Sequence, residues 1–266
     1  MSGYTTEELM ACVIARDLAD GEVGLTGFAG SGRAGVLAVG IPIAAMGLAR
    51  AFQAPDLTIL LAGSIVNPEI GRIDTLFETG EGMATLPAEA RISTADMVGM
   101  AMRGDITFGF SSAAQVDRFG NVNITAIGSY AEPRVRLLGT LFLPEHYTCF
   151  RREYLVMDHN PRAFVERVDF ITGPGGIDGG DSRERAGLKY GGPRLLVTDR
   201  AVIAFDGPGM TARLVSVHPG ELMEDVVAAT GFTLLQDGAT ETAPPTAEEL
   251  QVLSEKVDPR GVLLGG

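Results

Sequence analysis

The stretch AAQVDRFGNVNITAIG, residues Ala113 to Gly128, is the part of this chain from which its fold is best deduced. It follows Asp105–Phe110 (DITFGF), which has the composition of a buried strand, and passes through a polar turn into an alternating segment, Val122–Ile127. A sheet fixes such a turn in space while the side chains of the turn stay accessible to ligands. The pattern therefore predicts an α/β fold in which this turn presents polar groups.

Composition and charge narrow the class of protein. The chain has 266 residues, 45% of them hydrophobic, which suffices for one large α/β domain or two small ones, and a single domain over 1–266 is the simpler interpretation. It lacks an uncharged apolar run of membrane-spanning length and begins MSGYTTEEL, so we expect a cytoplasmic protein with no membrane segment. The formal charge of −13 argues against nucleic-acid binding, which needs a basic surface.

The two cysteines, Cys12 and Cys149, offer neither a disulfide framework nor the spacing of metal ligands. We expect both to be buried thiols, and we expect no metal site.

Local signals predict helices and strands along the whole chain. Helices are expected at Thr5–Gly21, where Thr5 and Glu8 form a capping box, at Pro42–Phe52, from Ser93, at Glu221–Thr230 and at Thr246–Val257. Further strands are expected at Val23–Thr26, Leu57–Leu61, Arg152–Asp158, Phe164–Thr172, Leu195–Val197, Val202–Phe205 and Thr211–His218. The glycine-rich segment Gly27–Gly35 is either a flexible entrance to the next helix or a phosphate-binding loop.

Four ordered blocks carry a family resemblance. They are AQVDRFGNVN within the opening stretch, APD at Ala54–Asp56, GPGGIDG at Gly173–Gly179 and VTD at Val197–Asp199. Together they resemble the β subunit of glutaconate CoA-transferase and its relatives, the class I (family I) CoA-transferases, from about Glu7 to about Pro259. The resemblance implies an open, mostly parallel sheet flanked by helices, the CoA-transferase (NagB/RpiA-like) fold, with a strand-rich C-terminal half.

The resemblance also implies where the catalytic residue belongs. In these transferases a glutamate at the end of a strand attacks the acyl-CoA thioester, forming an acyl anhydride and then a glutamyl-CoA thioester. Aligning Leu57–Leu61 with that strand puts Ala62 at the glutamate position, and a methyl group cannot attack a carbonyl. Glu69 lies too far along the chain and is expected to be a carboxylate at a helix entry. Ser64 has no histidine at a suitable spacing and is expected to be a hydrogen-bond donor, the one weak catalytic candidate.

The expected substrate and CoA-binding residues come from the polar turn and from the resemblance. They are Gly40, Gly63, Ser64, Gln115, Asn121, Asn123, Gly139 and Phe142. For Asp117 and Asn121 we place turn formation ahead of binding. The resemblance implies a glycine-rich loop that lines the thioester site. At the matching place this chain keeps Gly139, but the residues after it are bulky and apolar. Arg183 and Arg185 are interpreted first as surface ion pairs and second as contacts for a CoA phosphate or a partner.

Three functions are compatible with these residues. The favoured one is the β subunit of a heteromeric enzyme that acts on an acyl-CoA without the glutamate, by decarboxylation or hydrolytic C–C cleavage, as in 3-methylglutaconyl-CoA-type decarboxylases and steroid ring-opening hydrolases, which resemble this family. The alternatives are CoA transfer through another nucleophile and a non-catalytic β chain. The resemblance implies a homologous α subunit in an α2β2 heterotetramer, and coenzyme A as the substrate carrier without a bound cofactor. A sugar-phosphate isomerase or ligand-sensing domain of related fold is disfavoured by the order of the blocks.

Overall fold

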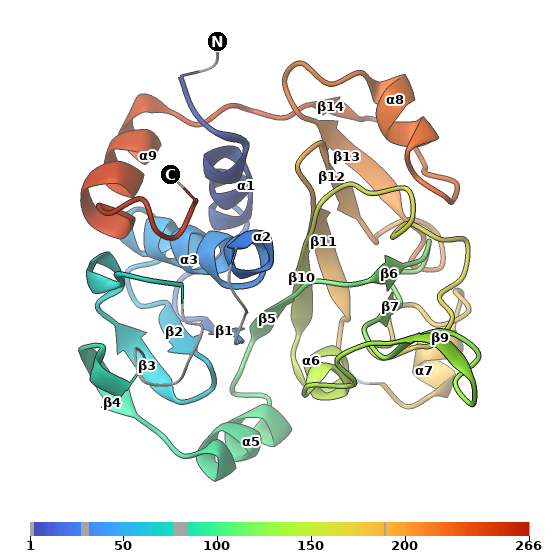
Figure 1. The fold of residues 1–266 in the computed structure, drawn as a ribbon, viewed down its shortest axis with the longest axis horizontal. Coiled ribbons are helices and arrows are strands. Elements are labelled where there is room, and N and C mark those ends of the chain that lie inside the picture. The colour runs from blue at the N-terminus through green and yellow to red at the C-terminus, as the bar shows by residue number, and fades with distance from the viewer. Residues whose placement is uncertain (1–2, 28–31, 77–83, 189, 266) are drawn as a thin grey trace. The chain divides into compact units, whose positions relative to one another are not determined.

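The computed structural model describes residues 3–27, 32–76, 84–188 and 190–265. Contacts within the chain divide it into two compact units (Figure 1), of which unit 1 comprises Met1–Phe110 with Ala243–Gly266 and unit 2 comprises Ser111–Thr242. Each unit has its own core, and they are described in turn. A single domain over 1–266 stays a prediction.

Unit 1 is built on the strand order β5-β1-β2-β3-β4. Its strands are β1 (Val23–Thr26), β2 (Thr58–Leu61), β3 (Ile65–Pro68), β4 (Ala88–Arg91) and β5 (Phe108–Ser111). Its helices are α1 (Thr6–Ala15), α2 (Gly32–Gly35), η1 (Val36–Gly40), α3 (Ile41–Ala51), η2 (Ile70–Arg72), α5 (Thr94–Arg103), α9 (Ala247–Val252) and η3 (Leu253–Val257). The central strand β1 is parallel to β2 and β5, whereas β2–β3 and β3–β4 are antiparallel. Helices α1, α3 and α9 pack together within this unit (Figure 1).

The predicted helix starts are confirmed where a side chain caps them. Thr5, Ser93 and Thr246 each form a capping box with the residue three positions on, so that two backbone N–H groups at each start are satisfied. Such a cap contributes about 1 kcal/mol to helix stability.

The helix at Pro42 begins earlier than predicted, at Gly32, because Pro42 lies inside it rather than at its start. The segment Val36–Gly40 is a π-helix, in which the Ile41 N–H bonds to the Val36 carbonyl. A π-turn interrupts the usual i to i−4 ladder, and a proline without an N–H is tolerated at such a place. The whole helical stretch, Gly32–Ala51, is long and apolar enough to cross a membrane, but 78% of its apolar window is buried within the protein, as in a core helix. Of the glycine-rich segment at Gly27–Gly35, residues 28–31 lie outside the described part of the chain.

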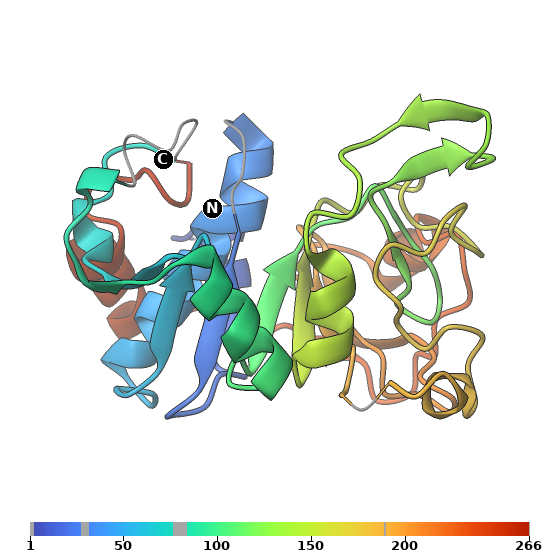
Figure 2. The same cartoon turned by 90° about the horizontal axis from the view of Figure 1, so that it is seen from below.

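Unit 2 is built on the strand order β14-β13-β12-β11-β10 and carries two further small sheets. Its main strands are β10 (Arg152–Val156), β11 (Pro193–Val197), β12 (Ala201–Ala204), β13 (Arg213–Val217) and β14 (Thr240–Glu241). The small sheets are β6 (Gln115–Val116) with β7 (Val122–Asn123) and β8 (Ala126–Gly128) with β9 (Pro133–Arg136), and the helices are α6 (Leu143–Cys149), α7 (Ser182–Arg185) and α8 (Met223–Ala228). In Figure 2 the yellow-green β8–β9 hairpin extends away from the rest of unit 2.

The predicted strands Leu195–Val197 and Val202–Phe205 are confirmed as β11 and β12, which pair antiparallel as a hairpin. Strand β10 is parallel to β11. Two strand predictions are wrong. Phe164–Thr172 forms no strand. Near its two ends the Val165 N–H bonds to the Val116 carbonyl of β6 and the Thr172 N–H bonds to the Val122 carbonyl of β7, but between them the Asp169 N–H bonds to the Gln115 side chain, so no continuous strand pairing forms. Val122–Ile127 is split into β7 and β8, because the Asn123 side chain accepts the N–H groups of Thr125 and Ala126 at the break.

Candidate functional site

The turn at Ala62 joins β2 to β3 at the carboxyl end of a parallel strand, where open α/β sheets place their ligands. Both central residues have left-handed backbones, with φ of 53° at Ala62 and 66° at Gly63, and the Ser64 N–H bonds to the Leu61 carbonyl at 3.2 Å. Positive φ at both central positions is the signature of a type I′ turn, which favours Asn-Gly. Alanine in this conformation costs about 1–2 kcal/mol, because its Cβ crowds the following carbonyl.

Neighbouring strands hold this turn in place. The Ala62 N–H donates to the Thr26 carbonyl at 2.7 Å, and the Thr26 hydroxyl donates to the Ala38 carbonyl at 3.1 Å. On the other side, the Ser64 carbonyl accepts the Ile92 N–H at 2.9 Å. Non-glycine residues persist in left-handed conformations where their surroundings dictate them, and such residues gather at functional sites.

Ser64 carries the one hydroxyl of this turn. The residue is half-buried and its hydroxyl has no hydrogen-bond partner among the described residues, so the hydroxyl is available to a ligand. Glu69 lies at the opposite end of β3, about 13 Å of extended chain away, where it directly precedes η2. Its side chain is 58% exposed beside Arg72, which agrees with the expected carboxylate at a helix entry and not with a relocated nucleophile.

Gly40 ends the π-turn and is buried against the C-terminal segment. A Cβ at this position would lie 1.8 Å from the Leu263 carbonyl oxygen, so the backbones approach too closely for any side chain. This contact gives Gly40 a packing role within unit 1, and its expected ligand contact stays a prediction.

In unit 2, Gln115 and Asn123 are fully engaged by protein groups. The Gln115 Oε1 atom accepts from Asn123 Nδ2 at 2.7 Å and from the Asp169 N–H at 3.0 Å, while its Nε2 donates to Asp169. Asn123 Nδ2 also donates to the Ala126 carbonyl at 2.7 Å. Both side chains are buried, so their amides fix the β6–β7 hairpin, and a bond to substrate would have to replace one of these contacts.

Asp117 and Asn121 form the turn of that hairpin, as predicted. The Asp117 carboxylate accepts the N–H groups of Phe119 and Asn121, and the Asn121 side chain bonds to both N–H and C=O of Ile177 in the GPGGIDG segment. Burial raises the pKa of Asp117, although these donors favour its charged form. Two of the four family blocks are thus joined by one asparagine.

The loop at Gly139 combines an open glycine with two strained apolar residues. Gly139 has a φ of 92° and free space around its α-carbon, and its N–H donates to the Ile124 carbonyl at 3.1 Å. Leu141 and Phe142 also have positive φ, and Leu141 is 63% exposed. The loop therefore presents apolar surface and an unobstructed backbone, while Leu143 is buried in the core.

Beneath this loop lies a buried pair that sequence inspection missed. His146 Nδ1 is 3.2 Å from Glu153 Oε1, and Glu153 Oε2 has no hydrogen-bond partner among the described residues. Burial and the nearby Glu153 charge raise the pKa of Tyr147 well above its usual value. No sequence motif marks this pair, because His146 lies in helix α6 and Glu153 in strand β10, and the two side chains meet only through the packing of α6 on β10.

Both interpretations of Arg183 are wrong, whereas Arg185 pairs with Asp181 at the surface as expected. Arg183 is 6% exposed and donates to the carbonyls of Tyr147, Pro174, Gly175 and Tyr190. Burial lowers its pKa. It ties three separate segments of unit 2 together and is not available to a phosphate.

The expected residues thus form two groups, each within one unit. Gly40, Gly63 and Ser64 belong to unit 1, with Ala62, and Gln115, Asn121, Asn123, Gly139 and Phe142 belong to unit 2. Among the described residues no cluster of three or more His, Cys, Asp or Glu side chains could hold a metal ion. Cys12 is buried as expected, but Cys149 is half-buried.

The sequence pattern of the family described as Coenzyme A transferase matches residues 8–229. The chain belongs to this family. It is 33% identical to one of the subunits of the 3-oxoadipate CoA-transferase of Pseudomonas knackmussii, over 95% of this chain and 93% of that protein. Its structure is similar to glutaconate coenzyme A-transferase from Acidaminococcus fermentans, with a TM-score of 0.83 and 26% identity over 99% of this chain and 98% of that one.

The structure of a decarboxylase, AibA/AibB, is also similar to this chain over nearly its whole length. Its structure matches with a TM-score of 0.76 and 28% identity, covering 98% of this chain and 99% of that one. The expected family and the α/β CoA-transferase fold, with its open sheet flanked by helices, are confirmed. The two kinds of relative match at similar identity, so similarity by itself does not distinguish transfer from decarboxylation.

Proposed function

We propose that this chain is the β-type subunit of a heteromeric enzyme that acts on an acyl-CoA thioester without a glutamyl nucleophile, by decarboxylation or by hydrolytic C–C cleavage. Coenzyme A serves as the substrate carrier. The observation that carries the proposal is the turn at Ala62, which lies at the carboxyl end of a parallel strand and has a strained backbone. It carries a methyl group where the family resemblance implies a glutamate.

No other side chain of this turn replaces the missing nucleophile. Glu69 is at the far end of β3, and the Ser64 hydroxyl has no hydrogen-bonded base among the described residues to activate it. The turn does retain a hydrogen-bond donor, the Ser64 hydroxyl. Donors of this kind stabilise negative charge on a thioester oxygen.

Charge of that kind develops when a carbon–carbon bond next to the thioester breaks. In decarboxylation the C–C bond electrons stay on the substrate and delocalise into the thioester carbonyl, carbon dioxide leaves, and a proton then adds to the carbon. This needs an oxyanion donor and a proton source but no nucleophile from Ala62. Similarity to the decarboxylase AibA/AibB over nearly the whole chain supports this chemistry.

A partner subunit belongs to the proposal. The names of AibA/AibB and of the matching 3-oxoadipate CoA-transferase chain describe proteins built from more than one kind of subunit. We expect a homologous α subunit that completes the site and supplies further catalytic groups, in a cytoplasmic α2β2 heterotetramer. The alternatives are genuine CoA transfer through another nucleophile, supported by the transferase relatives, and a non-catalytic β chain.

The test is to co-express the chain with an α-type subunit and to incubate the complex with a panel of acyl-CoA esters, with and without acetate. Mass spectrometry then follows the products. Release of carbon dioxide or addition of water, independent of acetate, supports the proposal. A new acyl-CoA that forms only with acetate contradicts it and establishes transfer. Unchanged activity in Ser64→Ala and Gly139→Ala complexes would identify a non-catalytic β chain.

The matched pair Ala62→Glu and Ala62→Gln tests the position itself. Glutamate restores the nucleophile that the family resemblance implies, and glutamine has the same shape without the nucleophilic carboxylate. We expect acetate-dependent exchange to appear with Ala62→Glu and not with Ala62→Gln. Exchange in neither variant would contradict the assignment of Ala62 to the glutamate position.

A further inference from the structure

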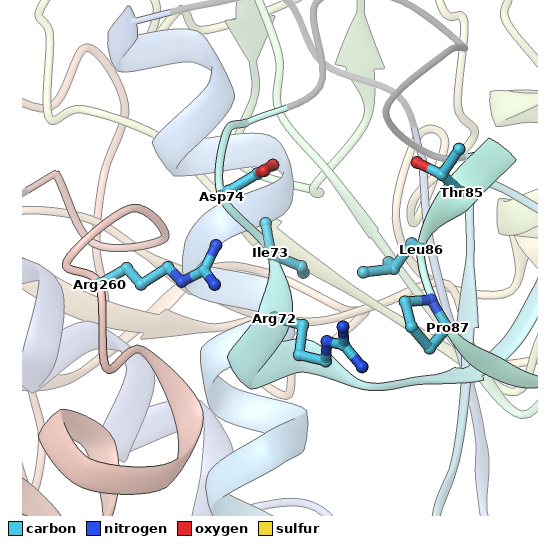
Figure 3. A pocket seen from close by; sticks show the side chains of 7 residues that line it. All are labelled: Arg72, Ile73, Asp74, Thr85, Leu86, Pro87 and Arg260. Atoms are coloured by element: carbon cyan, nitrogen blue, oxygen red, sulfur yellow. The ribbon is translucent and has the colours of Figure 1, made fainter.

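A cavity of about 200 Å³ lies in unit 1, away from the Ala62 turn. It is lined by Arg72, Ile73, Asp74, Thr85, Leu86, Pro87 and Arg260. Figure 3 shows Ile73 on one wall, Leu86 and Pro87 on the facing wall, and Arg260 reaching in from the C-terminal segment. The cavity is below the size of pockets that enclose drug-sized ligands, so it suits a small ion or the end group of a larger molecule.

Two of the seven lining residues are arginines, in a chain whose formal charge is −13. Arg260 forms no ion pair with any described residue. Arg72 approaches Glu69 at 3.4 Å, but both side chains are more than half exposed, and such a pair is weak. The Asp74 carboxylate lies at the other end of the cavity from the Arg72 guanidinium (Figure 3). The seven lining side chains, with two arginines and one aspartate, therefore carry a net charge of +1.

The segment that carries Arg260 is fixed by one carboxylate. Asp258 accepts the N–H groups of Val262, Leu263 and Leu264 at 2.8, 3.0 and 3.0 Å, which closes a tight turn around Arg260. The Gly261 N–H also bonds to the Asp258 carbonyl. The backbone of Arg260 is thus positioned before any ligand arrives.

The segment at η2 and the segment before β4, which form the other two walls, are joined to each other and to the C-terminal segment. The Glu69 N–H donates to the Pro87 carbonyl at 2.8 Å, which holds the start of η2 against the segment before β4. Gly71 packs so closely on η3 that a Cβ would lie 2.8 Å from the Lys256 carbonyl oxygen. Because all three segments belong to unit 1, the cavity does not depend on the placement of unit 2.

We propose that Arg72 and Arg260 bind a phosphate-type oxyanion in this cavity, either free phosphate or the phosphate end of a nucleotide. Guanidinium groups present forked N–H donors that match the oxygens of such anions. Ile73 on one wall, and Leu86 and Pro87 on the facing wall, reduce the access of water to the anion. This inference does not depend on the proposed function.

The test is isothermal titration of the full chain with inorganic phosphate and, separately, with adenosine 3′,5′-bisphosphate. We expect saturable binding that weakens about fivefold for each of Arg72→Gln and Arg260→Gln, and about 20-fold for both together. Arg103→Gln is the matched control. It removes the same charge from a surface pair with Asp105 in the same unit and should leave binding within about twofold of wild type.

Tighter binding of the bisphosphate than of phosphate, lost in the double variant, would identify the nucleotide as the source, and equal binding would identify free phosphate. Absence of saturable binding to either probe would overturn the proposal. So would a double variant that binds as well as wild type, or a control variant that weakens binding as much as the double variant. Circular dichroism of each variant verifies that the exposed substitutions leave the fold intact.

Discussion

Replacing Ala62 by glycine should stabilise the protein, whereas the same change at Ala90 should destabilise it. Ala62 has a φ of 53°, a conformation that costs an alanine about 1–2 kcal/mol and costs glycine almost nothing. Two costs oppose this gain. The greater freedom of glycine in the unfolded chain costs about 0.4–1 kcal/mol, and the lost methyl group gives up a fraction of the about 0.8 kcal/mol that its full burial would contribute. The net result is a small stabilisation, of about 0.5 kcal/mol or less.

Ala90 provides the control of opposite sign. It lies within β4, is exposed, and has no positive φ, so glycine there should cost about 0.5–1 kcal/mol. The two Ala→Gly variants should therefore differ by about 1 kcal/mol in free energy of unfolding.

Urea denaturation followed by circular dichroism measures this difference. At an m-value of about 2–3 kcal/mol/M, a difference of about 1 kcal/mol separates the two midpoints by about 0.4 M. Equal loss of stability in the two variants would refute the assignment of backbone strain to Ala62. A valine at position 62 sharpens the test, because a β-branched residue in the left-handed region should cost more than alanine does.

Two further predictions concern unit 2. Arg183→Met should lower the free energy of unfolding by at least about 3 kcal/mol, because it removes a buried donor from four carbonyls, of which those of Tyr147 and Gly175 are buried. Arg185→Met in the same helix breaks only an exposed pair and should change the free energy of unfolding by less than about 0.5 kcal/mol in the same urea titration. Burial lowers the pKa of His159 to about 4 from an ordinary value of 6.5, so the folded state binds fewer protons there and loses stability as pH falls from 6.5 towards 4. The stability advantage of wild type over His159→Gln should therefore shrink by up to about 2.5 kcal/mol between pH 7.5 and pH 4.5, and an advantage that stays constant over that range would contradict the neutral buried imidazole.

The sequence predicted those parts of the fold whose causes are local. The capping box at Thr5, the helix start at Ser93 and the apolar run before Ala62 depend on residues within one turn or one strand, and the structure confirms each of them. The early start of the helix at Gly32 was missed, because the π-turn that accommodates Pro42 has no signature in the composition. The Phe164–Thr172 segment alternates like a strand, but it bonds to β6 and β7 only near its two ends and does not pair continuously with either.

The candidate site divides in the same way. The end of β2 was predicted from its apolar run. The left-handed backbone of Ala62 was not predicted, although Gly63 in a short connection between strands was a usable signal. Arg183 could not have been assigned from sequence, because the carbonyls it contacts come from segments as far as 36 residues away. A side chain whose partners are distant backbone groups leaves no periodicity or motif at its own position.

The strain at Ala62 also bears on whether a glutamate could work there. The energetic penalty of the left-handed conformation arises from the Cβ atom, which alanine already carries, so longer unbranched side chains add little to it. The contacts that impose the conformation, from Thr26 and Leu61, are made by backbone atoms and do not depend on the side chain. We therefore expect Ala62→Glu and Ala62→Gln to stay within about 1 kcal/mol of wild type in the urea titration. If that holds, absence of acetate-dependent exchange in Ala62→Glu cannot be attributed to unfolding, and it then counts directly against the assignment of Ala62 to the glutamate position.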